Sequence, residues 1–174
     1  MNQIKTLTEI LQSVKRYAEA YADIQSIQEE SKLIPEGDQK TGCIGELYGY
    51  LYLAYTNPGA TLTYGTHSEK GWDIDCKTET RSMLVQIKTV SAYSKTRTIS
   101  PIHHGWDQLF ILYLDRNLAP AGFWIITDRS IVADGEVRKG CKCRNPESVA
   151  SGSPNLPFGD NRIEELLTAI VAQK

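Results

Sequence analysis

The spacing of apolar residues changes twice along this chain, and these changes limit its fold more than any other feature of the sequence. Up to residue 55, apolar residues recur every three or four positions, which is typical of amphipathic helices. From residue 62 to residue 133 they alternate with polar residues, as in half-buried strands, and from residue 163 the helical spacing returns. The sequence therefore predicts an α+β fold, in which helices flank a central mixed sheet.

Three helices are expected. The first has an apolar stripe made of Ile4, Leu7, Leu11, Val14, Ala18 and Tyr21. This stripe predicts that the helix packs on the domain, with a dimer seam as the alternative. The second helix, over residues 41–55, has a narrow face of Gly42, Gly45 and Gly49, which predicts close approach of its backbone to a neighbouring element. The last helix follows Asn161, which is expected to be its N-terminal cap.

The strands and loops complete the expected organisation. Strands are expected over residues 62–64, 72–76, 83–90, 108–115, 122–127 and 130–133. Residues 32–40 and 135–160 are rich in turn-forming residues and are expected to be loops. The length of 174 residues fits a single domain. We expect this domain to consist of an N-terminal helix and loop (1–40), a core (41–134), and an irregular loop with a C-terminal helix (135–174).

Charge and cysteine content limit the classes of function. The formal net charge of −2 excludes a strongly basic, histone-like binder, but not an enzyme that needs only a local basic face to act on nucleic acid. The sequence shows no signal peptide and no apolar run of membrane-spanning length, so a soluble cytoplasmic protein is expected. The cysteines at 43 and 76 lie in segments expected to be a buried helix and a buried strand, so they are expected to be thiols. The cysteines at 141 and 143 are too closely spaced for an ordinary zinc site.

A group of polar residues on two neighbouring strands carries the strongest chemical signal. Asp73 and Asp75 point to one face of their strand, and Gln86 and Lys88 point to one face of the next. A short linker makes the two strands a hairpin, so these groups can converge. Carboxylates are the ligands that Mg²⁺ prefers, whereas a glutamine offers only a neutral amide oxygen. A lysine can orient or deprotonate a water molecule, so the group suits hydrolysis of a phosphodiester.

Asp73, followed by Gln86-Ile87-Lys88 and preceded by a helix that carries Glu46, resembles the PD-(D/E)xK nuclease superfamily. This superfamily includes many type II restriction endonucleases, some homing endonucleases and junction resolvases. The resemblance covers residues 41–133. It implies a restriction-endonuclease-like core, in which the helices and strands follow the order α-β-β-β-α-β. The expected elements are taken to match this order. The resemblance also implies that Glu46, Asp73 and Gln86 hold Mg²⁺, with Mn²⁺ as a substitute, and that Lys88 is the catalytic lysine.

Two positions depart from the motif of the superfamily. Trp72 stands where a proline is usual, and Gln86 stands where Asp or Glu is commonest. A Gln-x-Lys form is known in the superfamily, including in active members. Asp75 competes with Asp73 for the role of metal ligand, and Asp73 is preferred because in the superfamily the acid usually starts the strand.

Basic residues and histidines outside the motif are candidates for contact with DNA. They are Lys95, Arg97, His103, His104, Arg138 and Lys142. The two lysines and two arginines lie in segments rich in hydroxyls or turn residues, a composition suited to phosphate contacts but also ordinary for solvated loops. The two histidines precede Asp107, but adjacent side chains on a strand face opposite ways and rarely bind one metal together.

The sequence as a whole predicts a Mg²⁺-dependent endodeoxyribonuclease of a restriction system. One active site cuts one strand, so cleavage of both strands favours a homodimer. The first helix is a candidate for the contact between the two copies. The alternative is a nuclease fold without catalytic activity that serves as a DNA- or protein-binding module of a defence system. A third interpretation is a nuclease that acts on RNA or on DNA junctions.

Overall fold

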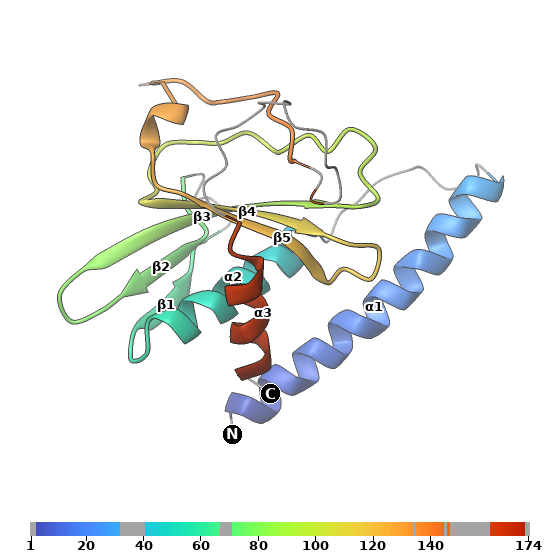
Figure 1. Cartoon of the computed structure of the whole chain (residues 1–174), viewed down its shortest axis with the longest axis horizontal. Coiled ribbons are helices and arrows are strands. Elements are labelled where there is room, and N and C mark those ends of the chain that lie inside the picture. The colour runs from blue at the N-terminus through green and yellow to red at the C-terminus, as the bar shows by residue number, and fades with distance from the viewer. Residues whose placement is uncertain are drawn as a thin grey trace.

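The computed structural model describes residues 3–31, 41–66, 71–133, 135–144, 146 and 161–172. Its helices are α1 (Gln3–Ser31), α2 (Thr41–Thr56), the short 3₁₀ helix η1 (Arg129–Ile131) and α3 (Ile163–Ala172). Its strands are β1 (Thr61–Tyr64), β2 (Ile74–Lys77), β3 (Ser82–Ser91), β4 (Gln108–Leu114) and β5 (Pro120–Ile126). The predicted α+β class is confirmed, and Figure 1 shows the arrangement.

The five strands form one mixed sheet, as the sequence predicted. Their order in space is the same as in the chain, β1-β2-β3-β4-β5. All neighbours are antiparallel except β3 and β4, which run parallel from Val85 opposite Gln108 to Ser91 opposite Leu114. A mixed sheet with helices packed on it is consistent with a restriction-endonuclease-like core.

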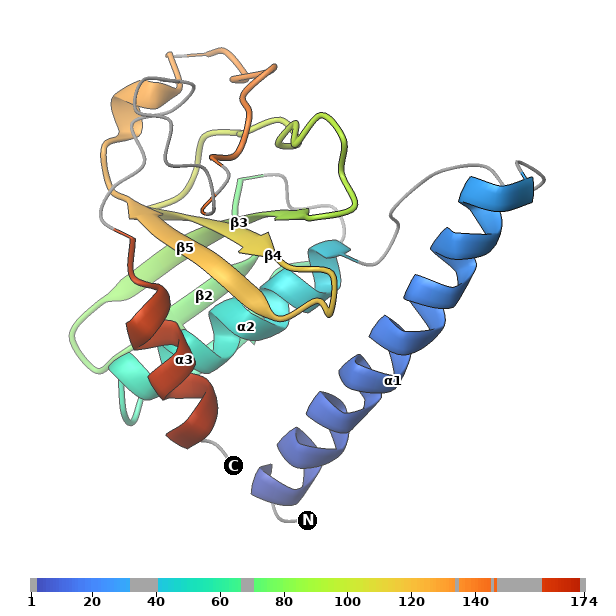
Figure 2. The ribbon, with the colours of Figure 1, turned by 45° about the vertical axis from the view of Figure 1, so that its right-hand side comes forward.

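One face of the sheet is covered by helices (Figures 1 and 2). Val85 and Ile87 of β3, Phe110 of β4 and Leu51 of α2 belong to the same buried apolar cluster on this side. Val85 and Ile87 therefore point into this core. Since side chains alternate along a strand, Gln86, Lys88 and the other even-numbered residues of β3 face the opposite side.

The opposite face is covered by two irregular segments, residues 92–107 and 135–144, which we call the cover. Backbone hydrogen bonds pair the two segments: Ile102 and Arg138 exchange two bonds of 3.0 Å, and the Ile99 N–H donates to the Cys141 carbonyl at 2.8 Å. Trp106 of the cover is buried in a second apolar cluster with Ile111 of β4. The sheet therefore has two cores, and the second one is built without an α-helix.

The connection between β3 and β4 corrects one expectation. The superfamily order places a helix there, but residues 92–107 contain no helix. A parallel pair needs only a long crossover, and here burial of Trp106 and pairing with residues 135–144 hold the crossover in place. The expected strand over residues 130–133 is also wrong, because Asp128 accepts a bond of 2.9 Å from the Ser130 N–H and starts the 3₁₀ helix η1.

Helix α2 approaches the sheet through two of its three glycines. A Cβ atom on Gly45 would lie 1.8 Å from Thr89 Oγ1, and one on Gly49 would lie 2.5 Å from Ile87 Cδ1. Gly42 would have nothing within 4 Å. The predicted close approach is confirmed for Gly45 and Gly49 and is wrong for Gly42, which is exposed.

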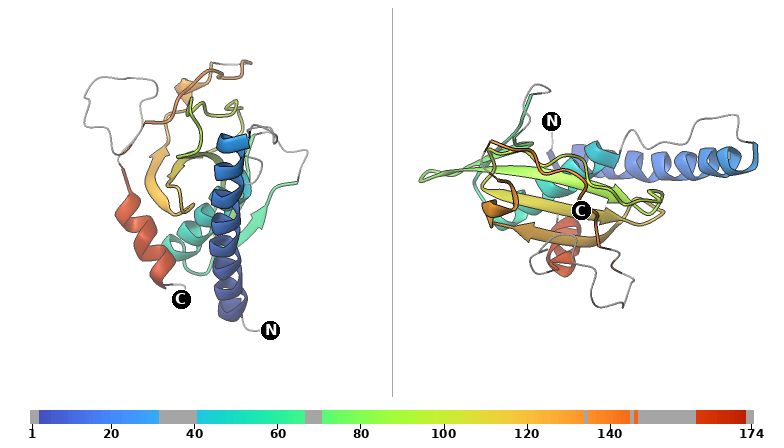
Figure 3. Two further views of the ribbon diagram at one scale, coloured as in Figure 1. Left: turned by 90° about the vertical axis from the view of Figure 1, so that its right-hand side faces the viewer. Right: turned by 90° about the horizontal axis from the view of Figure 1, so that it is seen from above.

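Helix α1 packs on the domain through its apolar stripe. Ala18 and Tyr21 are buried, and the Tyr21 ring lies 4.9 Å from that of Tyr93 in the cover, between ring centroids. The C-terminal end of α1 extends past the sheet (Figure 3, right). At the other end of the chain, Asn161 accepts from the Ile163 N–H at 3.2 Å and so caps α3 as predicted. No helix of the described residues is long and apolar enough to cross a membrane.

The cysteines provide a direct test of the packing. All four are thiols, but Cys43, expected to be buried, is exposed, whereas the other three are buried. Burial raises the pKa of the Cys143 thiol to about 12, which leaves very little reactive thiolate near neutral pH. We expect one thiol to react rapidly with a thiol reagent at pH 8, and all four to react after denaturation. Cys43→Ser should remove the rapid phase; a rapid phase that survives in this variant would contradict the packing described here.

Candidate active site

Asp73 is fixed between β2 and β3. It lies directly before β2, and its N–H donates to the Val85 carbonyl at 2.8 Å. Its Oδ2 accepts from the Ile87 N–H at 2.6 Å. The carboxylate therefore accepts a β3 hydrogen bond that a backbone carbonyl would accept if β2 extended further. The Gly65 N–H donates to the Asp73 carbonyl at 2.8 Å, which ties the residue to the end of β1 as well.

The competing carboxylate, Asp75, is used differently. Its Oδ1 accepts from the Ser82 hydroxyl, toward the turn of the β2–β3 hairpin. The charged groups that act on Lys88 are Asp73 and Glu46. The structure therefore favours Asp73 over Asp75 as the acid beside the lysine.

Lys88 is half-buried near the middle of the sheet. Strand β2 pairs with β3 only as far as Val85, so Lys88 lies beyond the end of that pairing, where groups from other elements can approach it. Burial lowers the pKa of Lys88, and attraction to Asp73 and Glu46 acts in the opposite direction. Burial likewise raises the pKa of Asp73, opposed by the bond from the Ile87 N–H and by the Lys88 charge. A lysine with a lowered pKa beside a carboxyl group with a raised pKa is typical of reactive sites as well as of buried ion pairs.

Glu46 brings the third charged group from helix α2. It follows Gly45, whose close contact with Thr89 brings this turn of the helix against β3. Its charge acts on both Lys88 and Tyr64. Glu46 and Asp73, which the sequence singled out on two other segments, therefore both lie within electrostatic reach of Lys88.

Gln86 is also beside this group, but its side chain contacts the cover. It is 1% exposed, and its Oε1 accepts from the His103 N–H at 3.3 Å. The amide oxygen that was expected to face a metal ion is thus engaged by the backbone of the cover. This contact fixes residues 103–104 close to the candidate site.

The donor set is one that Mg²⁺ accepts. Among the described residues no three His, Cys, Asp or Glu side chains form a metal site. Mg²⁺ commonly uses one or two carboxylates and keeps several water molecules, so Asp73 and Glu46 suffice for it. Asp73 Oδ1 has no hydrogen bond to any described residue, which leaves it available as a ligand. A structural zinc ion, which needs four nitrogen or sulfur ligands, does not fit these residues.

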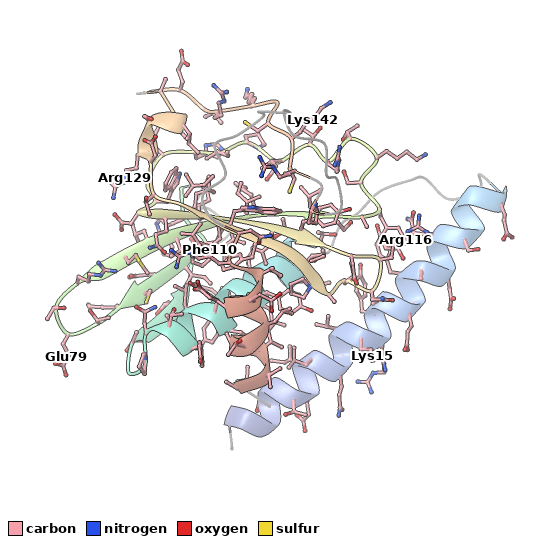
Figure 4. All side chains as sticks on the ribbon, in the orientation of Figure 1. Lys15, Glu79, Phe110, Arg116, Arg129 and Lys142 are labelled. Carbon is pink, nitrogen blue, oxygen red and sulfur yellow. The ribbon has the colours of Figure 1, made fainter. Side chains whose placement is uncertain are left out.

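The other candidate residues all lie in the cover. Lys95, Arg138 and Lys142 are exposed, and Arg97 is half-buried. Figure 4 shows Lys142 on the side of the sheet away from α2 and α3. The structure therefore places these cations on the same side of the sheet as Lys88, on a chain whose overall charge is negative.

The two histidines do not form a metal site with Asp107. His104 Nε2 lies 2.7 Å from the Ala133 carbonyl, and the His103 carbonyl accepts from the Trp106 indole at 2.8 Å. Asp107 accepts from the Leu84 N–H at 2.8 Å and forms an ion pair with Arg129. His103 therefore attaches the cover to β3 through Gln86, whereas His104 contacts the segment that follows η1.

One aromatic group at the site was missed by the sequence analysis. Tyr64 at the end of β1 stacks on Tyr50 of α2, with ring centroids 5.3 Å apart. Tyr50 follows Glu46 by four positions, so the two side chains share one face of the helix. That spacing was readable from the sequence, whereas the position of Tyr64 required the register of β1.

Comparisons with known proteins do not identify the chain. A scan against models of protein families finds no match, and a search of curated proteins finds none. Among solved structures, the bacterial homing endonuclease I-Ssp6803I is similar, with a TM-score of 0.43 and 14% identity, covering 79% of this chain and 97% of that chain. At this TM-score and identity the likeness is too distant to support a statement about function. Membership of the PD-(D/E)xK superfamily stays a prediction.

Proposed function

We propose that this protein is a Mg²⁺-dependent endodeoxyribonuclease that hydrolyses phosphodiester bonds in DNA. The observation that carries this proposal is that Asp73, directly before β2, and Glu46 of α2 both lie within electrostatic reach of Lys88 on β3. Two carboxylates and a half-buried lysine with a lowered pKa are the groups that this reaction requires.

In the proposed mechanism the chain supplies three actions. Asp73 and Glu46 would hold Mg²⁺, whose charge would polarise a phosphate oxygen. The neutral amine of Lys88 takes a proton from the attacking water, and its ammonium form offsets the negative charge that develops on the phosphate. Gln86 positions the cover beside the reacting groups through His103.

We propose that the cations of the cover bind the DNA backbone. Lys95, Arg97, Arg138 and Lys142 lie on the side of the sheet that Lys88 faces. Phosphate contacts of this kind position DNA without reading its sequence. A role in a restriction system fits such a small nuclease domain, and cutting both strands would use two copies of the chain, one site for each strand.

A second candidate function rests on Gln86. Because its amide oxygen is buried and bonded to the His103 N–H, the third motif position is poorly disposed to bind metal. This favours a nuclease fold that binds DNA or protein without cleaving DNA. DNA binding without cleavage would distinguish it from the first proposal.

The test is cleavage of plasmid and phage DNA with Mg²⁺, Mn²⁺ or EDTA. We expect fragments with either metal and none with EDTA. Asp73→Asn should lower the rate by about 100-fold or more, because the charge stabilisation that a bound metal provides is worth several kcal/mol.

Asp75→Asn is the matched control, since Asp75 lies two positions along the same strand and bonds to Ser82 instead. It should cleave at a rate close to that of the parent protein. Equal losses in both variants would contradict the assignment of Asp73. Binding of DNA without cleavage in any metal would support the second candidate function.

A further inference from the structure

Tyr64 is an exposed aromatic residue beside the candidate active site. Its side chain is 46% exposed, whereas Tyr48 and Tyr52 on α2 are 6% and 5% exposed. Tyr64 lies at the end of β1, a strand at the edge of the sheet. An edge position leaves part of the ring accessible to a ligand.

One side of the Tyr64 ring is already supported. The rings of Tyr50 and Tyr64 are stacked, with an interplanar angle of 21° and 5.3 Å between centroids. Tyr50 is half-buried on α2, which holds the pair against the rigid part of the fold. A ring fixed from behind loses little conformational freedom when a flat group stacks on its other side.

Three observations place Tyr64 near the catalytic groups. Tyr64 lies within electrostatic reach of Glu46. The next residue, Gly65, donates its N–H to the Asp73 carbonyl at 2.8 Å. A Cβ on Gly65 would lie 3.2 Å from Cζ3 of Trp72, so the residue before Asp73 packs closely against the end of β1. The aromatic pair is therefore built into the same corner of the fold as the two candidate metal ligands.

We propose that Tyr64, supported by Tyr50, is a stacking platform for an unpaired nucleobase of the DNA that is cut at Asp73 and Lys88. This inference rests on the proposed nuclease function and specifies its substrate. Every base has a flat π-face, so such a platform binds unpaired bases with little dependence on sequence. In a duplex these faces are stacked on neighbouring bases and are not available. The substrate is therefore DNA with an unpaired base near the cut, either a single strand or a locally opened duplex.

The variants separate stacking from simple packing. Tyr64→Leu keeps an apolar side chain against Tyr50 but removes the aromatic face, and Tyr64→Phe keeps the ring and removes only the hydroxyl. Tyr55→Leu is the matched control, because Tyr55 is 43% exposed on α2 and has no part in the proposed site. Thermal unfolding of each variant shows whether the fold is retained.

The experiment measures DNA binding in a Lys88→Met background, where the DNA stays intact. The probes are a single-stranded oligonucleotide that contains the fluorescent base 2-aminopurine, a duplex with one mismatch at that base, and a fully paired duplex. We expect Tyr64→Leu to weaken single-strand binding about tenfold and to abolish quenching of the fluorescent base, since one stacked base contributes on that scale. Tyr64→Phe and Tyr55→Leu should bind as the background protein does, and binding of the paired duplex should change little. Binding of the mismatched duplex with quenching would show that local opening suffices.

Three results would overturn the proposal, and they are distinguishable. Suppose that the background protein binds DNA, and that Tyr64→Leu binds every probe as tightly as the background protein and still quenches the fluorescent base. The stacking proposal is then wrong, and the nuclease proposal stands. If the protein with Lys88 intact cleaves no DNA and the background protein binds none of the probes, the nuclease proposal fails and the platform fails with it. A loss in Tyr64→Leu that is equal for single strands and paired duplex also excludes base stacking.

Discussion

Lys88→Met is expected to lower the rate of DNA cleavage by about 10²–10⁴-fold, the contribution of a positioned general acid or base. Methionine has a similar length but carries no charge and cannot accept a proton. The substitution should not destabilise the fold, because burial already disfavours the charged form of Lys88. Affinity for DNA should be largely retained, because the cations of the cover are unchanged. Single-turnover cleavage with protein in excess measures the chemical step.

Lys77→Met is the control for this experiment. Lys77 lies on the neighbouring strand β2, but it is exposed and stands at the end of that strand away from Asp73. It should cleave at the parent rate. Cleavage by Lys88→Met at the same rate as by Lys77→Met would show that Lys88 is not the catalytic lysine, whatever its surroundings.

Gly45→Ala is expected to destabilise the fold by about 1–3 kcal/mol, the usual cost of overpacking. The new Cβ would lie 1.8 Å from Thr89 Oγ1 and 2.7 Å from Thr89 Cβ, so helix α2 or strand β3 must shift. Alanine has a higher helix propensity than glycine by about 1 kcal/mol, but this gain is smaller than the steric cost. Because Glu46 is the next residue, the same shift should also reduce cleavage. Urea unfolding measures the change as a lower midpoint with an unchanged slope.

Gly42→Ala provides a control in the same helix. A Cβ at Gly42 meets nothing within 4 Å and the residue is exposed, so only the helix propensity changes. We expect this variant to be more stable than the parent by up to about 1 kcal/mol. Destabilisation of similar size in both variants would mean that glycine at these positions serves some purpose other than close packing.

Local sequence signals predicted most of the secondary structure. The alternation from Met83 to Val90 predicted a strand that the structure extends by one residue at each end, Ser82–Ser91. The two-residue period also predicted that Gln86 and Lys88 would share one face of their strand, and the burial of Val85 and Ile87 in the cluster on the helix side agrees with this. Patterns of this kind succeed because they depend on backbone geometry alone.

Features set by distant contacts could not be predicted. The crossover from β3 to β4 is held by residues 135–144, so the sequence of residues 92–107 alone did not reveal its conformation. The same holds for Gln86: its oxygen binds the His103 N–H, and no spacing in the sequence indicates that this amide turns to the cover. The resemblance to a known motif supplied the pairing of Glu46 with Lys88, which neither residue type nor spacing could establish.

Irregular surface segments ordinarily change in length and sequence faster than any other part of a protein. The cover of this protein is an exception, because Ile102 and Trp106 fill the second core and two bridges, at Thr98 with Lys142 and Ile102 with Arg138, fix its register. A single residue inserted between Ile99 and Ile102 would shift one bridge relative to the other. It would also move His103 away from Gln86. Evolutionary divergence in this protein is therefore constrained where loops are usually free, and a gain of new specificity by loop insertion would have to occur outside the paired part of the cover.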